Sequence, residues 1–337
     1  MPRLRVARVA PCTASRFAGL ERGLLSRAGG EPVLLLAELA GPALLLGRFQ
    51  RAASALRLGE VRAAGLPLAR RACGGRTLLA AEGTLGVFLS VPPGAVLFAG
   101  PVAPERVMNR AVRGLLQGLR LAGAASAAYF GRDFVSASQR QVAAVSQEGT
   151  EEGGMAFEAV VATAGPLGVP PGLTGYPRHS DPRAGGPPAG TVLGPAGEPR
   201  AAAAVAELVV RGYAEAGSDP EPWEGPLPDG GELPAEEEEQ GLSGSGVADV
   251  PIGFAEALVR AEAGKIVEAR LRGDFIAPAF AVLGLERALA GCPLAFPEVG
   301  RRVDDAFRRP HAFVHGLTGL GILAEAVLAA GRAGAGP

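Results

Sequence analysis

The chain has 337 residues, 48% of them hydrophobic and 20% charged, so it can bury one large core or two smaller ones, and we expect two. Its net charge of −1 is uneven, because residues 1–142 carry 19 arginines against 7 acidic residues and residues 143–337 carry 14 basic against 27 acidic residues. With only 5% aromatic residues and no helix-turn-helix pattern, the basic first part favours an acidic protein or a phosphorylated small molecule over nucleic acid.

Cysteine usage and hydropathy indicate the cellular compartment. Cys12, Cys73 and Cys292 make an odd number without close spacing, which argues against a disulfide scaffold or a thiolate metal site. The first residues contain arginines but no apolar signal-peptide core, and no apolar run of about 18 residues follows. We expect a soluble cytoplasmic protein that has no membrane partner.

A helical pattern opens the chain and short apolar runs follow it. Apolar residues recur at helical spacing after Thr13 and stop at Gly29 and Gly30, which predicts a helix. The next apolar runs read as buried strands, at 32–39, 43–49, 76–81 and 86–91. The last two of these flank a Glu-Gly-Thr turn at 82–84 and therefore predict a hairpin.

The middle of the chain alternates between helical and strand-like patterns. Residues 103–123 place apolar side chains on one side, which predicts a long amphipathic helix packed on a sheet. Further strands are predicted at 133–137, 141–146 and 155–162. Residues 163–200 are rich in proline and glycine and should be mostly loop, and a helix is expected over 200–216.

A change in composition marks a domain boundary. Residues 226–248 contain four consecutive glutamates with proline, glycine and serine around them, so we expect an acidic flexible linker between domains at 1–225 and 249–337. In the second domain, residues 253–275 read as a hairpin that turns at 263–264. Helices are predicted to follow it, at 279–290, 298–308 and 316–331.

The stretch "RRACGGRTLLAAEGTLG", residues 70–86, is a candidate anion site. The amides of Gly74 and Gly75 could cradle a negative charge, and Arg70 or Arg71 could hold a phosphate or carboxylate with two hydrogen bonds. A tight turn with solvated arginines is the alternative for this stretch taken alone.

The order of four blocks along the chain resembles the lipoate–protein ligase family. "LLLGRFQR", "RRACGGRTLLAAEGTLG", "GRDFVSASQRQVAAVSQE" and the distant "GDF" stand where the family has GR-x-Q-N, RR-x-S-G-G-G-A-V-Y-H-D-x-G-N, GRND with RK-x-x-G, and GDF. The resemblance covers nearly the whole chain. It implies an α/β (α+β) fold with a biotin/lipoate-ligase-like mixed sheet flanked by helices, and a small α/β accessory domain.

The resemblance also implies an activity. Such enzymes condense lipoate or octanoate with ATP and Mg²⁺ to an acyl-adenylate, and then pass the fatty acyl group to a lysine of a lipoyl acceptor domain, here an acidic partner of the basic half. By resemblance Asp133 could help to hold Mg²⁺ or ATP. The other implied substrate- or ATP-binding residues are Gly47, Arg48, Gln50, Arg71, Cys73, Gly74, Gly75 and Arg76.

The family's catalytic lysine falls on Gln141. Glutamine donates a hydrogen bond but brings no charge, and the only lysine of the chain, Lys265, lies in the second-domain hairpin. Arg140 or Arg76 could supply the cation that stabilises the developing charge. Other positions differ from the family too: its third glycine, histidine, aspartate and asparagine correspond to Arg76, Ala80, Ala81 and Thr84.

Three functions stay open at this point. The chain is an active ligase that has replaced its lysine, a catalytically impaired homologue that binds an acyl-adenylate or a lipoyl domain, or an interaction protein on the same scaffold. The glycine loop and "GDF" favour the first two, and the loss of the lysine favours the second over the first. His311 and His315 have the spacing of metal ligands on a helix, but no third ligand stands nearby and we expect no metal site.

Overall fold

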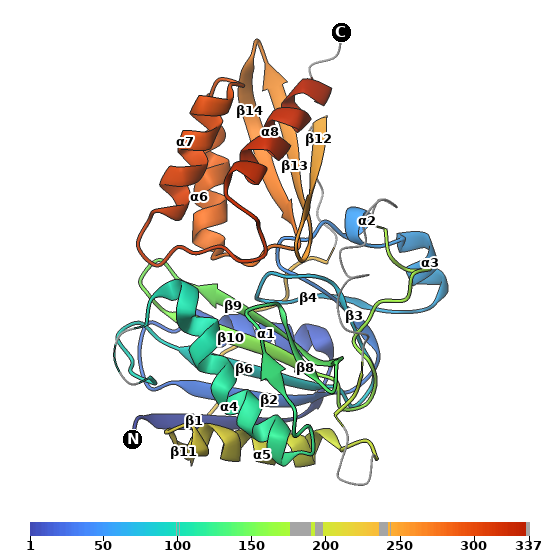
Figure 1. Ribbon diagram of the computed structural model, residues 1–337, viewed down its shortest axis with the longest axis vertical. Coiled ribbons are helices and arrows are strands. Elements are labelled where there is room, and N and C mark those ends of the chain that lie inside the picture. The colour runs from blue at the N-terminus through green and yellow to red at the C-terminus, as the bar shows by residue number, and fades with distance from the viewer. Residues whose placement is uncertain are drawn as a thin grey trace.

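The structure is a computed structural model that describes residues 1–98, 100, 102–175, 190–192, 198–235, 242 and 244–334. Figure 1 shows a large lower part built around one sheet and a smaller upper part formed by residues 244–334. Much of the predicted loop at 163–200 and the run of four glutamates lie outside the described residues.

A mixed sheet of eight strands forms the centre of the lower part, in the order β11-β1-β2-β6-β10-β9-β8-β7. Strand β1 pairs in parallel with β2 and β11, and the other neighbours are antiparallel. The strands are β1 Arg3–Cys12, β2 Val33–Leu39, β6 Leu85–Val91, β7 Ala128–Tyr129, β8 Phe134–Ala137, β9 Arg140–Gly149, β10 Met155–Val161 and β11 Asp219–Pro222. The predicted mixed α/β architecture is confirmed.

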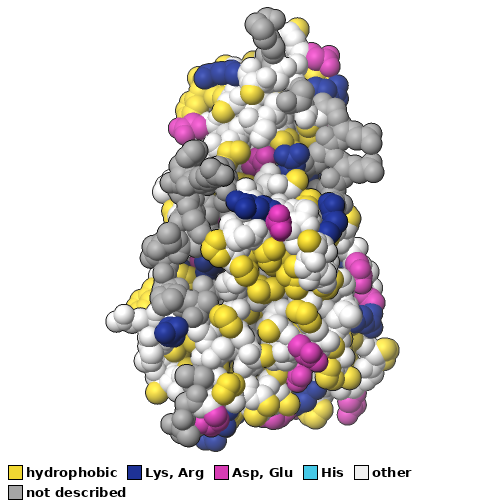
Figure 2. All heavy atoms as spheres, turned by 90° about the vertical axis from the view of Figure 1, so that its right-hand side faces the viewer, with side chains coloured by type: hydrophobic (Ala, Val, Ile, Leu, Met, Phe, Trp, Pro, Cys, Tyr) yellow, Lys and Arg dark blue, Asp and Glu magenta, His cyan; other side chains and the backbone are white. Residues whose placement is uncertain are grey.

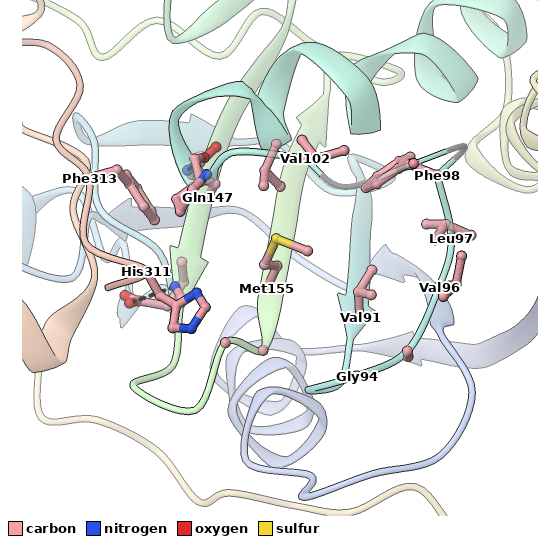
Figure 3. A pocket seen from close by; sticks show the side chains of 18 residues that line it. Val91, Gly94, Val96, Leu97, Phe98, Val102, Gln147, Met155, His311 and Phe313 are labelled. Atoms are coloured by element: carbon pink, nitrogen blue, oxygen red, sulfur yellow. Dashed lines mark hydrogen bonds between the residues drawn. The ribbon is translucent and has the colours of Figure 1, made fainter. Parts of the chain in front are cut away.

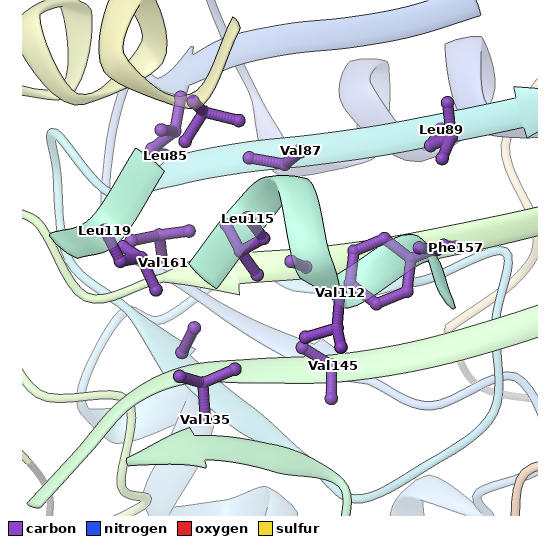
Figure 4. Close-up of a cluster of buried hydrophobic side chains, with 14 of the residues drawn as sticks. Leu85, Val87, Leu89, Val112, Leu115, Leu119, Val135, Val145, Phe157 and Val161 are labelled. Carbon is purple, nitrogen blue, oxygen red and sulfur yellow. The ribbon is translucent and has the colours of Figure 1, made fainter. Parts of the chain in front are cut away.

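Helices cover both faces of this sheet. Helices α4 (Val107–Leu121) and α5 (Ala202–Glu215) pack on one face, and α1 (Ala14–Leu25) packs on the other with a cap from the Thr13 side chain. Figure 4 shows Val112, Leu115 and Leu119 of α4 lying over strand residues. Because neighbouring strand residues point to opposite faces, Val87 joins the α4 core while Phe88 joins the α1 core. The predicted helices at 13–30, 103–123 and 200–216 are confirmed.

A second sheet of three short strands lies beside the first, and it corrects one prediction. Strand β3 (Ala43–Leu46) runs between β4 (Leu68–Arg70) and β5 (Leu78–Ala80), next to the short helices α2 (Ala52–Ala55) and α3 (Leu58–Ala63). The turn at 82–84 exists, but β5 and β6 do not form the predicted hairpin. Strand β6 is buried along its whole length and pairs with β2 and β10 on its two edges, so it has no free edge for β5.

The upper part has its own core. Strands β12 (Gly244–Val250), β13 (Gly253–Glu262) and β14 (Lys265–Gly273) form an antiparallel sheet on which α6 (Ala279–Leu289), α7 (Phe296–Phe307) and α8 (Gly321–Gly334) pack. The predicted β13–β14 hairpin is confirmed. Strand β12 begins at Gly244, inside residues 226–248 that were expected to be linker. Helix α8 starts later than predicted.

The rest of the expected linker is attached to the lower part where it is described. The Gly230 amide donates to the Gly19 carbonyl at 2.9 Å, and Arg70 donates to the carbonyls of Pro234 and Ala235 at 2.8 and 2.7 Å. Residues 226–235 are therefore held against α1 and β4 rather than free. Figure 2, which views the molecule from the α2–α3 side, shows basic side chains around the waist between the two parts.

Among the described helices, none is both long enough and apolar enough to cross a membrane.

Candidate functional site

Gln141, which the resemblance matches to the family lysine, has an arginine from another segment against it. Nη2 of Arg76 donates to Oε1 of Gln141 at 2.8 Å, and its Nε lies 2.7 Å from Oδ2 of Asp133. The guanidinium carbon is also 5.8 Å from the centre of the Phe134 ring. The loop after β4, the start of β8 and the start of β9 thus bring three predicted site residues together.

The burial of this group limits what it can bind. The side chains of Arg76 and Asp133 are 13% and 5% exposed, so each charge depends on the other for compensation. Oδ2 of Asp133 lies against the guanidinium of Arg76, so a Mg²⁺ ion at this oxygen would have to share it with the arginine. The prediction that Asp133 helps to hold Mg²⁺ or ATP stays a prediction.

Arg140, the other candidate cation, does not join this group. Its side chain is exposed, whereas that of Gln141 next to it in β9 is buried, because adjacent strand residues point to opposite faces. The aliphatic part of Arg140 lies beside Gly190. Of the two predicted replacements for the lysine, Arg76 is the one that reaches Gln141.

Arg70 does not hold a ligand. Its Nη1 donates to the carbonyls of Gly47, Arg48 and Gln50 at 3.2, 3.1 and 2.5 Å, while Nε and Nη2 hold the 234–235 segment. The side chain is 3% exposed. Neither the predicted phosphate grip nor the solvated alternative applies, since Arg70 is a buried cross-link between the 47–50 turn and the chain before β12.

Arg71 is also engaged inside the protein. Nη1 lies 3.1 Å from Oε1 of Glu158 on β10, and Nη2 donates to the carbonyl of Arg76 at 2.8 Å. Burial alone would lower the pKa of Arg71, but the adjacent Glu158 carboxylate outweighs it and raises that pKa. The buried ion pair leaves Arg71 turned toward the sheet rather than toward an open pocket.

Glu21 and Cys73 complete the buried cluster beneath the loop. Oε2 of Glu21 accepts from the Ala72 amide at 3.3 Å, and burial together with the charge of Glu158 raises the pKa of Glu21 well above its usual value. Glu21 therefore favours its neutral form more than an ordinary glutamate does, and it lies beside the Arg71–Glu158 ion pair. Burial and nearby carboxylates also raise the pKa of Cys73 well above that of a free thiol, so it is no thiolate nucleophile.

Neither Glu21 nor Glu158 was among the residues that the sequence singled out. Each is a lone acid in an otherwise apolar stretch, "AGLERGLL" or "MAFEAVV". A single charged residue in such a pattern is a signal for a buried, paired group. The partner of Glu158 is Arg71, which lies 87 residues away along the chain. Sequence spacing does not reveal such a pair.

The glycine loop is closed by the upper part of the molecule. The amide of Gly75, which has a positive φ of 98°, donates to the carbonyl of Phe275 at 3.2 Å. The carbonyl of Gly74 accepts from Oγ of Ser146 at 2.9 Å. A side chain at Gly47 would collide with the Gly75 carbonyl, because its Cβ would lie 1.8 Å away. The Gly75 amide, expected to face an anion, therefore faces Phe275.

Two blocks of the resemblance that are distant in sequence, "LLLGRFQR" and "GDF", meet next to the glycine loop. Nε2 of Gln50 lies 2.5 Å from Oδ1 of Asp274, and its Oε1 accepts from the Gly47 amide and from Oγ1 of Thr77. The rings of Phe49 and Phe275 stack with their centres 5.1 Å apart. In this arrangement Gly47 and Gln50 shape the turn and join the two parts.

Arg48 lies on the other side of the same turn. Its Nη1 donates to the carbonyl of Ala72 at 3.2 Å and lies 3.7 Å from Oε2 of Glu148 on β9. Oε1 of Glu148 accepts from the amides of Gly149 and Ala279, the latter at 2.8 Å at the start of α6. Burial raises the pKa of Glu148 to about 7, although Arg48 and both amides act against that change.

A cavity of about 470 Å³ opens beyond Glu148. Figure 3 shows that Val91, Leu97, Phe98, Met155 and Phe313 surround it, with His311 at one side. It lies at the far end of β9 from Gln141, seven residues along the strand or roughly 23 Å at the usual rise. The cavity is therefore separate from the Arg76 group.

No cluster of three or more metal-ligating side chains occurs in the described part of the chain. His311 is exposed with a positive φ, and His315 pairs through its backbone with Ile276, so the two do not share a helical face as their spacing suggested. His179 lies outside the described residues.

Comparison with known proteins identifies the fold. No protein-family model and no curated protein sequence matches the chain. Among solved structures, P. falciparum LipL1 in complex with lipoate matches with a TM-score of 0.65 and 11% identity, over 90% of this chain and 94% of that one. A bipartite lipoate protein ligase from Thermoplasma acidophilum, described with its E2 lipoyl domain, matches with a TM-score of 0.55 and 15% identity, over 66% and 88%. The chain has the fold of the lipoate–protein ligases, as the order of its sequence blocks predicted.

Proposed function

We propose that the chain activates lipoate or octanoate with ATP and passes the acyl group to a lysine of a lipoyl acceptor domain. One observation carries this proposal: Nη2 of Arg76 lies 2.8 Å from Oε1 of Gln141, so a cation from the glycine loop stands next to the position of the family lysine. The solved structures of the same fold include one with lipoate and one described with a lipoyl domain, which supports this choice of substrate and partner.

Arg76 would do the electrostatic work of the missing lysine. In the first step the substrate carboxylate attacks the α-phosphorus of ATP and pyrophosphate leaves; in the second the acceptor lysine attacks the acyl carbonyl and AMP leaves. Negative charge develops on oxygen in both steps, and a fixed guanidinium stabilises it. Nε lies in ion-pair contact with Asp133 and Nη2 donates to Gln141, so we assign the third nitrogen, Nη1, to the substrate.

The proposal requires the upper part to release the loop. While the Phe275 carbonyl accepts from the Gly75 amide, that amide is not available to a phosphate. We therefore propose that residues before the acidic run form a catalytic domain and those from about β12 onward an accessory domain that moves during the reaction. The free cysteines are compatible with the reducing cytoplasm in which we place this reaction.

The test is acyl transfer, followed by the intact mass of an acceptor domain in the presence of ATP, Mg²⁺ and octanoate or lipoate. The natural chain should add one acyl mass to the acceptor, and Arg76→Ala should abolish or strongly slow that addition. Arg140→Ala is the matched control, since this nearby arginine is exposed whereas Arg76 is buried against Gln141. Equal rates for all three proteins would refute the role of Arg76.

A second function is favoured by a different observation. Arg71 is paired with Glu158 and the Gly75 amide with Phe275, so two groups expected to hold a ligand are satisfied internally. This suits a catalytically impaired homologue that binds an acyl-adenylate or an acidic lipoyl domain. Binding of a lipoyl domain or of a non-hydrolysable octanoyl-adenylate mimic without any acyl transfer, in the same assay, would select this alternative.

A further inference from the structure

A second cavity, of about 550 Å³, lies where the 47–50 turn meets the upper part. Its walls come from that turn, from β4, from the chain before the acidic run, and from β14 and α6. Five arginines and one acid line it, namely Arg48, Arg70, Arg270, Arg272, Arg287 and Glu286. None of Arg76, Asp133 and Gln141 is among the lining residues, so this cavity is distinct from the proposed catalytic group.

Positive charge exceeds negative charge around this cavity. Glu286 accepts from the Leu271 amide at 2.7 Å and from Arg272 at 3.2 Å. Two further carboxylates pair with lining arginines from outside the wall: Glu268 lies 2.8 Å from Arg270, and Glu148 lies 3.7 Å from Arg48. Within the part of the chain that the structure describes, five guanidinium groups stand against three carboxylates, an excess of two positive charges. The excess is larger when Glu148 is protonated, which its pKa of about 7 allows near neutral pH.

The arginines differ in how free they are to meet a ligand. Arg70 is buried and contributes its charge without an open donor, since backbone carbonyls occupy its nitrogens. Arg287 is exposed on α6 and donates through Nε to Leu283, with no acidic partner among the described residues. The side chains of Arg48 and Arg270 are 23% and 41% exposed. Guanidinium groups on opposite walls can therefore converge on one occupant.

We propose that this arginine cavity binds a small polyanion, either a phosphorylated metabolite or a polycarboxylate. A planar guanidinium binds phosphate and carboxylate oxygens through paired hydrogen bonds, and several of them around one cavity select a compact ligand with more than one negative charge. Arg48, which the sequence resemblance marks for substrate or ATP binding, belongs to this cavity and not to the Arg76 group. A bound polyanion bridges the two parts of the molecule, because both contribute arginines.

The sequence also contains an internal competitor for these arginines. Glu236–Glu239 directly follow Ala235, whose carbonyl accepts from Arg70. Titrations are therefore run on the natural chain and on a chain in which these four glutamates are replaced by glutamine. Competition from within the chain then cannot hide the binding of an added anion.

The experiment measures Kd by calorimetry for inorganic pyrophosphate and for citrate, at low ionic strength. These two probes distinguish a phosphate ligand from a carboxylate ligand. Arg287→Gln and Arg270→Gln should each weaken the preferred probe about tenfold, the effect of losing one charged hydrogen bond. Arg332→Gln is the matched control, because Arg332 is exposed on α8 of the same part and does not line the cavity.

Some outcomes would overturn the proposal. The proposal is overturned if neither probe binds to either chain. It is also overturned if Arg287→Gln and Arg270→Gln leave the Kd unchanged. Pyrophosphate is also a product of the proposed activation step. If Arg76→Ala, and not Arg287→Gln, weakens it, pyrophosphate binds at the catalytic group and the arginine cavity is not its site. Acyl transfer need not occur for any of these measurements, so the two proposals succeed or fail separately.

Discussion

Nε2 of Gln50 lies 2.5 Å from Oδ1 of Asp274, and both side chains are fully buried although 224 residues separate them. The same glutamine accepts from the Gly47 amide and from Thr77, so its orientation is fixed on both sides. Phe275, next to Asp274, stacks on Phe49 and accepts from the Gly75 amide. The turn after β3 and the end of β14 therefore form one polar joint between the two parts.

Loss of the Asp274 carboxylate should weaken this joint. Asp274→Ala leaves the buried Gln50 amide without this acceptor, and an unsatisfied buried donor costs about 1–3 kcal/mol. We expect the urea unfolding midpoint, followed by circular dichroism, to fall accordingly. Asp249→Ala, at an exposed position of β12, is the control and should change the midpoint little. An equal effect of the two substitutions would contradict the role of the joint.

The sequence predicted this joint only in part. The order of "GRFQ", the glycine loop and "GDF" indicated one fold, and that fold places them side by side. The contacts within the candidate site were not predicted. Arg76 and Gln141, for example, are 65 residues apart, and no spacing rule predicts such a pair. The loop arginines were read as ligand donors because their internal acceptors, Glu158 and the 234–235 carbonyls, come from remote segments.

Strands β1, β4, β7, β11 and β12 were not predicted, and two of them show the physical reason. Strand β1 carries arginines that pair with Glu31 and Glu221, so its polar residues hid the strand pattern. Strand β12 reads "GSGVADV" and looks like a linker. Its glycines instead allow close approach of α8, because a Cβ at Gly244 would lie 1.9 Å from the Ala330 carbonyl. For β12 the composition indicates flexibility, while packing decides the structure.

A catalytic cation should be able to act from position 141 as well as from position 76. Arg76→Ala is expected to slow acyl transfer on the order of a hundred- to a thousand-fold, the usual effect of losing one electrostatic contact to the transition state. Arg76→Gly combined with Gln141→Lys moves a cation to the family's position beside Asp133 and should recover most of the rate. Gln141→Lys alone, with Arg76 still present, places two cations against one carboxylate and should not exceed the natural rate. Rates come from intact-mass time courses of the acceptor domain.

Two results would contradict this exchange. A single Gln141→Lys chain more active than the natural chain would mean that Arg76 does not fill the role. A double variant as slow as Arg76→Ala would mean that position 141 is not equivalent to the family's lysine. Circular dichroism of each variant shows whether folding is retained, so that loss of activity is not confused with loss of structure.

Glu148 should make stability depend on pH. Burial raises its pKa to about 7 from an ordinary value of 4.5, so the folded chain holds this proton more tightly than the unfolded chain. The free energy of unfolding should therefore fall as the pH rises from about 4.5 to 7, by roughly 3 kcal/mol in total. Glu148→Gln keeps an oxygen for the Ala279 amide and has no proton to lose, so it should not show this fall.

The measurement is the difference in free energy of unfolding between Glu148→Gln and the natural chain, in urea, from pH 4.5 to 8. This difference removes the contributions of other groups, such as Glu21, whose pKa is also raised by burial. It should grow with pH and level off above 7. A flat difference for Glu148→Gln would show that its carboxyl titrates normally.

The three cysteines should react in an order set by burial. Cys12 is half-buried, whereas Cys73 and Cys292 are buried. Burial raises the pKa of both Cys12 and Cys73, and nearby carboxylates raise that of Cys73 further, so its thiolate is both rare and inaccessible. Iodoacetamide at pH 8, followed by peptide mass spectrometry, should label Cys12 first and Cys73 only after unfolding in urea. Labelling of folded Cys73 as fast as that of Cys12 would require an open loop, and would make Cys73 a candidate for an acyl-accepting nucleophile. Slow labelling of Cys73 would instead support direct transfer of the acyl group from the adenylate to the acceptor lysine, which is the route in which Arg76 acts.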